Sequence, residues 1–165
     1  MKSKKKPNIE TKDKTRILIV DDHPVIREGL TQIINRENDF LVCAEAGDIR
    51  EAVNAVRKQK IDLALVDMLL NGDTGIEVIK KIKALCPDII VLIFSMSHEL
   101  IHVKRALRAG ARGYITKDEL SEKIIAAIRQ VLKGKLYLSK NLAQKLSKNE
   151  IDRLLADHCQ SCSGK

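Results

Sequence analysis

Acidic residues follow two of the short apolar runs in this sequence, at the point where each run ends. Asp21 and Asp22 come directly after the first run, and Asp67 comes directly after the third. Three carboxylates gathered at one place would repel one another unless a cation neutralised them, and an all-oxygen ligand set favours Mg²⁺ or Mn²⁺ over Zn²⁺. A carboxylate beside such an ion can act as a nucleophile toward a phosphoryl group while the ion neutralises the developing charge. These residues therefore predict phosphoryl chemistry at a divalent metal site.

A hydroxyl and an amine follow two further apolar runs. Ser95 comes after the fourth run and Lys117 after the fifth. A serine hydroxyl can donate to a phosphoryl oxygen, and the lysine ammonium is a compact positive charge for the same group or for a carboxylate. Any one Asp at such a position is more often a helix cap or a turn residue. All these residues together are hard to explain by capping, and they favour one functional site.

The elements that must position these residues can be predicted from the apolar pattern. From residue 16 onward, short apolar runs alternate with stretches whose apolar residues recur at helical spacing, which is typical of βαβ units and predicts an α/β fold. Ligands of an open parallel sheet bind outside the carboxyl ends of its strands, which is where the polar residues lie. The predicted strands are residues 17–20, 40–44, 63–66, 89–94 and 113–115.

Five helices are expected between and after these strands, and local signals mark their ends. The fourth is predicted from about residue 98 to 109 and the fifth from about 119 to 133. The signals are a proline suited to an opening turn (Pro24), two pairs resembling capping boxes (Asp48 with Glu51, Thr74 with Glu77) and two glycines at helix ends (Gly110, Gly134).

Length and charge indicate one domain with appendages. The chain has 165 residues, 44% of them apolar, and a net charge of +8 that comes largely from lysines ahead of the first apolar run. We expect a basic flexible tail at 1–14, one domain at 15–135, and a linker helix with a short tail at 136–165. The tail could add sequence-independent attraction to nucleic acid phosphates. No signal peptide or membrane-spanning run is visible, so we expect a cytoplasmic protein with reduced thiols.

The order and spacing of Asp21, Asp22, Asp67, Ser95 and the run 113–117 resemble the response-regulator receiver domain of two-component systems, over roughly residues 15–135. The stretches DDHPVIREGL, RALRAGARGYITKDE and GKLYLS are similar to the NarL/FixJ subgroup, whose receivers usually precede a helix-turn-helix DNA-binding domain. The resemblance implies a doubly wound, flavodoxin-like sheet of five parallel strands in the order 2-1-3-4-5, with helices on both faces.

The resemblance also assigns roles at the site. It implies that Asp67 is the phosphoacceptor and that a sensor histidine kinase supplies the phosphoryl group. Asp22 and Asp67 would bind Mg²⁺ (or Mn²⁺) through their side chains, with Asp21 in support and the backbone carbonyl of Leu69 as a further ligand. Lys117 would bind the phosphoryl group. Only self-phosphorylation and slow self-dephosphorylation are expected, so the chain is read as a signalling protein and not an enzyme.

The output implied by the resemblance passes through two switch residues. Ser95 would move toward the new phosphate, and Tyr114 matches an aromatic switch that alternates between outward and inward rotamers. Taken alone, Tyr114 is more simply a packing residue of its strand. The movement would reshape the face formed by the fourth helix and fifth strand, and so control homodimerisation or an output domain, with transcription regulation expected in a longer protein.

Three departures from the family pattern carry expectations of their own. Leu70 and Asn71 stand where Met and Pro are common, which predicts a less rigid loop. Met96 stands where Ala or Gly is common, and its thioether could screen the phosphoryl group from water. The chain stops at Lys165, before a helix-turn-helix could form, so DNA binding is expected only through a domain absent from these residues. A fragment of a longer regulator and a natural single-domain protein both stay open.

Other functions are compatible with part of this pattern. A stand-alone receiver in a phosphorelay fits the same residues, and a Mg²⁺-dependent aspartyl phosphatase fits less well, because its nucleophile would normally follow the first strand. A docking module without the chemistry is disfavoured, because all the site residues are retained. His158, Cys159 and Cys162 have no second ligand pair, so a zinc or redox site is not expected. His23 is expected to be a helix-start or surface residue.

Overall fold

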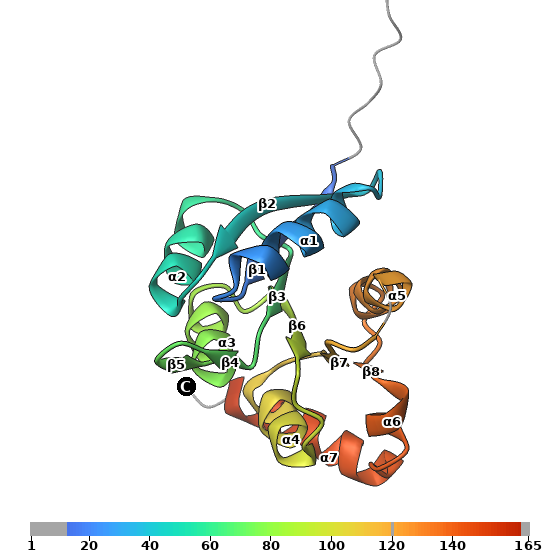
Figure 1. Ribbon diagram of the computed structural model, residues 1–165. Helices are drawn as coiled ribbons and strands as arrows, with labels where there is room; N and C mark the ends of the chain where they lie inside the picture. The colour runs from blue at the N-terminus through green and yellow to red at the C-terminus, as the bar shows by residue number, and fades with distance from the viewer. Residues whose placement is uncertain (1–12, 120, 163–165) are drawn as a thin grey trace, which may run out of the picture.

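A parallel sheet of six strands forms the centre of the computed structural model, which describes residues 13–119 and 121–162 (Figure 1). The order is β2-β1-β3-β6-β7-β8. The first five strands of this order confirm the predicted 2-1-3-4-5 arrangement, and the sixth was not predicted. The strands are β1 (Thr15–Val20), β2 (Phe40–Ala46), β3 (Leu63–Val66), β6 (Ile90–Ser95), β7 (Gly113–Thr116) and β8 (Tyr137–Leu138).

Helices cover both faces of the sheet, as a doubly wound fold requires. On one face, Ile17 and Ile19 of β1 belong to the same apolar cluster as the buried residues of α1 and α5. On the other face, Leu18 and Val20 belong to a second cluster, shared with α2, α3 and α4. The strand therefore buries alternate residues on opposite faces. The helices are α1 (Pro24–Asn35), α2 (Ile49–Lys58), α3 (Gly75–Leu85), α4 (Leu100–Ala109) and α5 (Ser121–Leu132).

Most of the predicted helix signals act as expected. Pro24 opens α1, and Gly110 and Gly134 have φ angles of 115° and 81°, which a residue with a Cβ rarely adopts. The capping box at the start of α3 has both of its hydrogen bonds. At α2 only half of the predicted box forms, because the Glu51 carboxylate accepts from the amide of Gly47 instead of Asp48.

The segment after residue 135 packs on the central sheet. β8 pairs in parallel with β7, and it is followed by α6 (Lys140–Ala143) and α7 (Lys148–Cys162), which lies beside α4 (Figure 1). Leu142, Leu146 and Leu154 are buried in the same cluster as α4. β8 is only two residues long, which is too short to show a hydrophobic periodicity, and tertiary contacts stabilise it. The sequence pattern therefore does not reveal it. The domain boundaries at 14/15 and 135/136 stay a prediction.

A short hairpin follows β3, where the sequence predicts a less rigid loop. β4 (Leu69–Leu70) pairs antiparallel with β5 (Asp73–Thr74), and Asn71 and Gly72 form the turn between them. Gly72 has a φ of 80°, which fits the third position of a type II turn. The hairpin replaces the proline that is common in this loop.

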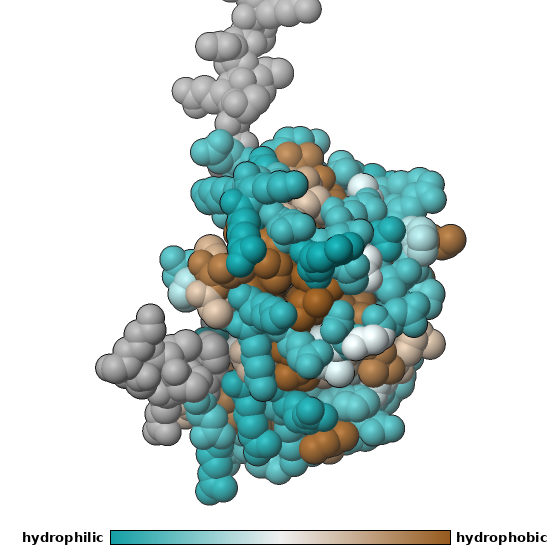
Figure 2. All heavy atoms as spheres, turned by 90° about the vertical axis from the view of Figure 1, so that its left-hand side faces the viewer, coloured by the Kyte–Doolittle hydropathy of each residue, from teal (hydrophilic) through white to brown (hydrophobic). Residues whose placement is uncertain are grey.

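The surface over α2 and α3 carries apolar side chains between hydrophilic ones (Figure 2). A groove between these helices is lined by Ile49, Val53 and Leu85 together with Arg50 and Arg57. Over the described residues, no helix is both long and apolar enough to cross a membrane.

Candidate functional site

Three of the predicted site residues meet at the carboxyl ends of the parallel strands. Asp21 follows β1, Asp67 follows β3 and Lys117 follows β7, and the two carboxylates are 1% and 5% exposed. The Lys117 Nζ donates to Asp21 Oδ2 at 2.7 Å and to Asp67 Oδ2 at 2.9 Å. One ammonium therefore bridges two nearly buried carboxylates that are 46 residues apart in the chain.

Burial and charge shift the pKa values of Asp67 and Lys117 in opposite directions. Burial raises the pKa of the Asp67 carboxyl, and the hydrogen bond and charge of Lys117 offset only part of the rise. For Lys117, burial alone would lower the pKa, but hydrogen bonds to Asp21 and Asp67 outweigh it and raise the pKa. Lys117 is therefore charged at neutral pH, while Asp67 bears a desolvation cost that a further cation would relieve.

Asp22 gives the site a place for such a cation. Its Oδ1 atom is buried and makes no hydrogen bond, although His23 Nδ1 lies 2.9 Å away and makes its hydrogen bond to Asp21 instead. Ligand atoms of Asp21, Asp22, His23 and Asp67 all lie within 4.8 Å of one another. A buried carboxylate oxygen without a donor is costly, and a hard divalent cation would satisfy it. The residues present thus fit the predicted Mg²⁺ site.

The hairpin after β3 contributes backbone donors. The amide of Leu69 donates to Asp67 Oδ1 at 3.3 Å, and the amide of Asn71 donates to Asp22 Oδ2 at 3.1 Å. A proline at position 71 would lack this second donor. Asn71, which stands where proline is common in the family, therefore ties the loop to the acidic cluster through its amide. The predicted ligand role of the Leu69 carbonyl stays a prediction, because the contacts seen here involve its amide.

The two predicted switch residues lie on the neighbouring strands β6 and β7 and are fully buried. Ser95 is 0% exposed, and its Oγ accepts from the amide of Ser97 at 3.1 Å. Tyr114 is also 0% exposed and points inward, where its hydroxyl donates to the Ser97 carbonyl at 2.9 Å. Burial raises the pKa of the Tyr114 hydroxyl, although hydrogen bonding to Ser95 and Ser97 partly offsets the rise.

Strand β7 also connects the site to the C-terminal segment. The amide and the hydroxyl of Thr116 both donate to Ser139 Oγ, at 3.0 and 3.3 Å, and all of these groups are buried. The amide of Ser139 donates to the Tyr114 carbonyl at 3.1 Å. Thr116 directly precedes Lys117, so Ser139 fixes the strand end from which the lysine reaches the carboxylates.

Sequence reasoning missed three contributors to the site. The sequence predicts His23 as a helix-start or surface residue, and it does precede α1 with its side chain 65% exposed. Its Nδ1 atom, however, also faces the carboxylates. Its position directly after two aspartates was the available signal. Phe94 lies under Lys117, with 5.5 Å from Nζ to the ring centroid, a cation–π contact. Asn71 acts through its backbone, which no side-chain pattern reveals.

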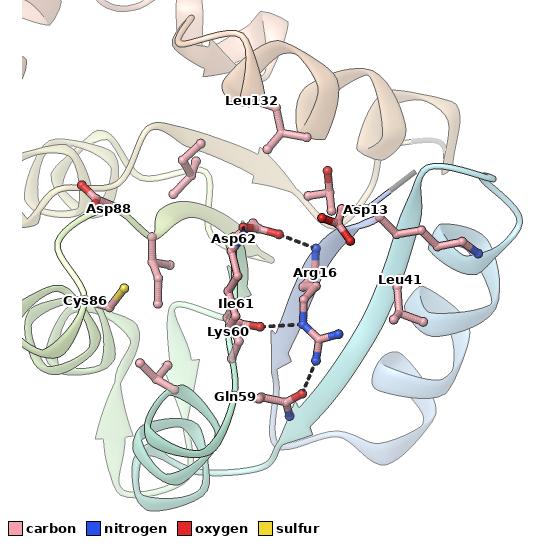
Figure 3. Close-up of a pocket in the computed structure, with 15 residues that line it drawn as sticks. Asp13, Arg16, Leu41, Gln59, Lys60, Ile61, Asp62, Cys86, Asp88 and Leu132 are labelled. Carbon is pink, nitrogen blue, oxygen red and sulfur yellow. Dashed lines mark hydrogen bonds and ion pairs between the residues drawn. The ribbon is translucent and has the colours of Figure 1, made fainter. Parts of the chain in front are cut away.

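A large cavity lies at the opposite end of the sheet and takes no part in this chemistry (Figure 3). Its volume is about 910 Å³, and it is lined by the first residues of β1 and the segments that lead into β3 and β6. Arg16 spans it, bonding through its amide to Asp62 at 2.8 Å and through its guanidinium to Gln59 at 2.6 Å and to the Lys60 carbonyl at 2.8 Å. These contacts hold β1 to the segment before β3.

Comparison with known proteins agrees with this geometry. A family model described as the response regulator receiver domain matches residues 17–129. YxjL, a transcriptional regulatory protein of Bacillus subtilis (strain 168), is 35% identical over 135 residues, which cover 82% of this chain and 62% of that protein. The oxygen regulatory protein NreC of Staphylococcus aureus (strain JH9) is 37% identical over 132 residues, which cover 79% of this chain and 61% of that protein.

A solved structure is similar over most of its length. The crystal structure of a two-component response regulator of the LuxR family from Aurantimonas sp. SI85-9A1 has a TM-score of 0.77 and 35% identity, covering 86% of this chain and 97% of that one. The present chain spans about three fifths of the length of YxjL and NreC. The family match, the sheet order and the relatives agree: this chain belongs to the response regulator receiver family, in its NarL/LuxR group.

Proposed function

We propose that this chain is a phosphorylation switch in which Asp67 accepts a phosphoryl group from a sensor histidine kinase, with Mg²⁺ held beside it. One observation supports this above all. The Lys117 ammonium bridges Asp21 and Asp67, while the neighbouring Asp22 keeps a buried oxygen without a donor. A cluster of this kind is a poor stabilising device, because uncompensated buried carboxylates cost free energy. It is suited to gaining a cation and a phosphoryl group.

The proposed transfer uses each residue at a stated atom. A carboxylate oxygen of Asp67 attacks phosphorus, and the bond between phosphorus and the donor nitrogen of the kinase histidine breaks, so that the nitrogen keeps the electron pair. Asp21, Asp22 and Asp67 would hold the cation, which when bound supplies positive charge opposite the phosphoryl oxygens. Lys117 Nζ would then donate to a phosphoryl oxygen, and the hydroxyl of Ser95, the last residue of the neighbouring strand β6, would donate as well.

The proposed output begins at the buried switch residues. A doubly charged phosphoryl group would draw Lys117, which follows β7, and Ser95, which ends β6. Both movements would affect Tyr114 of β7, whose hydroxyl donates to the Ser97 carbonyl just after β6. We propose that the resulting change at α4 and β7 controls homodimerisation or an output domain. Transcription regulation in the cytoplasm is the expected role in a longer protein, with DNA contacted by a helix-turn-helix outside these residues, because YxjL is a transcriptional regulatory protein.

Acetyl phosphate with Mg²⁺ tests the phosphoacceptor directly. We expect the intact mass to rise by one phosphoryl group in the wild type and in Asp73→Asn, a matched control on the same hairpin, but not in Asp67→Asn. Chelation of the cation should abolish the rise. Phosphorylation of Asp67→Asn to the wild-type level would contradict the assignment.

Two further measurements separate the alternatives. One stable phosphoryl group on Asp67 supports a switch, whereas many turnovers of excess phosphomonoester would indicate a phosphatase. Met96 is 69% exposed, and faster loss of phosphate from a Met96→Ala variant would support the proposed screening of the phosphoryl group from water.

A further inference from the structure

His23 is held in contact with the acidic cluster by its own backbone. It precedes Pro24, which restricts it to an extended conformation, and its φ and ψ are −95° and 109°. Its amide donates to Asp21 Oδ1 at 2.9 Å, which holds the Asp21 carboxylate beside the start of α1. The Nδ1 atom then lies 3.0 Å from Asp21 Oδ1 and 2.9 Å from Asp22 Oδ1, while the rest of the ring reaches solvent.

These separations match those of neighbouring ligands on one metal ion. In an octahedral site with bonds of about 2.1 Å, adjacent ligand atoms lie about 3.0 Å apart. His23 Nδ1 has this relation to oxygens of both Asp21 and Asp22, and Asp67 offers a fourth ligand atom within 4.8 Å of the others. Of these oxygens, Asp22 Oδ1 is buried without a hydrogen-bond donor.

We propose that His23 supplies a nitrogen ligand to the divalent cation, so that the site binds Mn²⁺ in preference to Mg²⁺. The inference rests on the proposed function, because it extends the cation site assigned there to three aspartates. Imidazole nitrogen is a good ligand for transition metals and a poor one for Mg²⁺, which prefers oxygen and retains water. The side chain therefore acts on the choice of ion and not on the phosphoryl group.

Electron spin echo spectroscopy of bound Mn²⁺ gives a readout that does not depend on phosphorylation. The full chain loaded with Mn²⁺ alone should show modulation from a directly bound imidazole ¹⁴N. The modulation should disappear in His23→Gln and persist in His102→Gln, a matched control whose imidazole bonds to Ser97 Oγ at 2.7 Å outside the cluster. Loss of the nitrogen ligand should weaken Mn²⁺ binding about tenfold and Mg²⁺ binding less than about twofold, as measured by calorimetry.

The possible outcomes are distinguishable. If Mn²⁺ binds with the same affinity to His23→Gln and to wild type, or binds without nitrogen modulation, the inference is overturned and the aspartate site remains. If neither ion binds to the wild type, the cation site of the proposed function fails together with the inference. A second variant, His23→Asn, controls for effects specific to the glutamine side chain in His23→Gln. It should show the same loss of Mn²⁺ affinity.

Discussion

At the scale of single residues, the site holds more negative charge than its one ammonium can neutralise. Lys117 reaches Asp21 and Asp67, while Asp22 accepts from the amide of Asn71 and has His23 Nδ1 2.9 Å from its other oxygen. Burial is the largest cause of the raised pKa of Asp67, which means that the ionised carboxylate is less favourable in the folded chain than in the unfolded one. The site is therefore expected to lower stability when no cation is present.

Replacement of Asp67 by Asn should stabilise the cation-free protein at pH 7 by about 1 kcal/mol, the size of an ordinary single substitution. Because the folded-state pKa is raised above the ordinary value of 3.8, the folded state binds more protons in the window between the two values. The free energy of unfolding of the wild type thus falls as pH rises through that window. The advantage of the variant should shrink as pH falls through the same window.

Urea unfolding in the presence of a chelator, from pH 7 down to pH 4, measures this difference. Asp73→Asn, outside the cluster, should change the free energy of unfolding little across the series. A less stable Asp67→Asn at pH 7 would mean that the ion pair with Lys117 outweighs the burial of the carboxylate.

At the scale of elements, the close approach of α3 to the end of β3 holds Asp67, the proposed phosphoacceptor, in place. Gly75 opens α3 and its amide donates to the Met68 carbonyl at 2.8 Å. A Cβ on Gly75 would lie 2.5 Å from the Asp67 carbonyl oxygen and 2.9 Å from Met68 Cα. Both contacts are with backbone, so the helix or the strand end would have to move.

Gly75→Ala should therefore cost about 2 kcal/mol or more of stability and slow phosphorylation of Asp67. Gly29→Ala is the matched control, because Gly29 is exposed within α1 with nothing within 4 Å of its added Cβ. It should raise stability by about 0.5 to 1 kcal/mol through helix propensity. Chemical denaturation and phosphorylation rates check both variants, and equal effects of the two would contradict the proposed clash.

The buried hydroxyl of Ser139 supports the pairing of β7 with β8. In Ser139→Ala, the amide of Thr116 would lose its acceptor inside the protein, which should cost about 1 to 3 kcal/mol. Amide hydrogen exchange should become faster at Thr116 and in β8, and stay unchanged in α2. Unchanged protection of Thr116 would show that the hydroxyl is dispensable.

At the scale of the whole molecule, the sequence predicts the repeating elements and the residues at their ends, and it misses single contacts that no repeating pattern marks. The run Leu63–Val66 and the order of the first five strands follow from apolar periodicity and the family pattern. The predicted side chains of the cluster meet at one end of the sheet for the same reason. Ser139 and Asn71 contribute through partners 23 and 49 residues away, which local propensity does not encode.

Ending the chain at Lys135 should lower the free energy of unfolding by about 3 kcal/mol or more, because β8 and three buried leucines would be lost. Each buried leucine contributes about 2 kcal/mol, reduced by the entropy of ordering the segment. A chain ending at Asp157 keeps these leucines and should match the full chain. Urea unfolding of the three lengths compares them, and equal stability throughout would mean that residues 136–165 act only as a linker.

The molecule also carries its own optical reporters. It has two tyrosines and no tryptophan, and both rings lie on the neighbouring strands β7 and β8. Burial, together with the charge and hydrogen bond of Glu119, raises the pKa of Tyr137 to about 12, so its phenol stays neutral under ordinary assay conditions. Tyrosine emission from the native chain thus comes from β7 and β8, beside the proposed switch, and in Tyr137→Phe it originates from Tyr114 alone. Rearrangement of that ring can be followed in real time without attaching any dye.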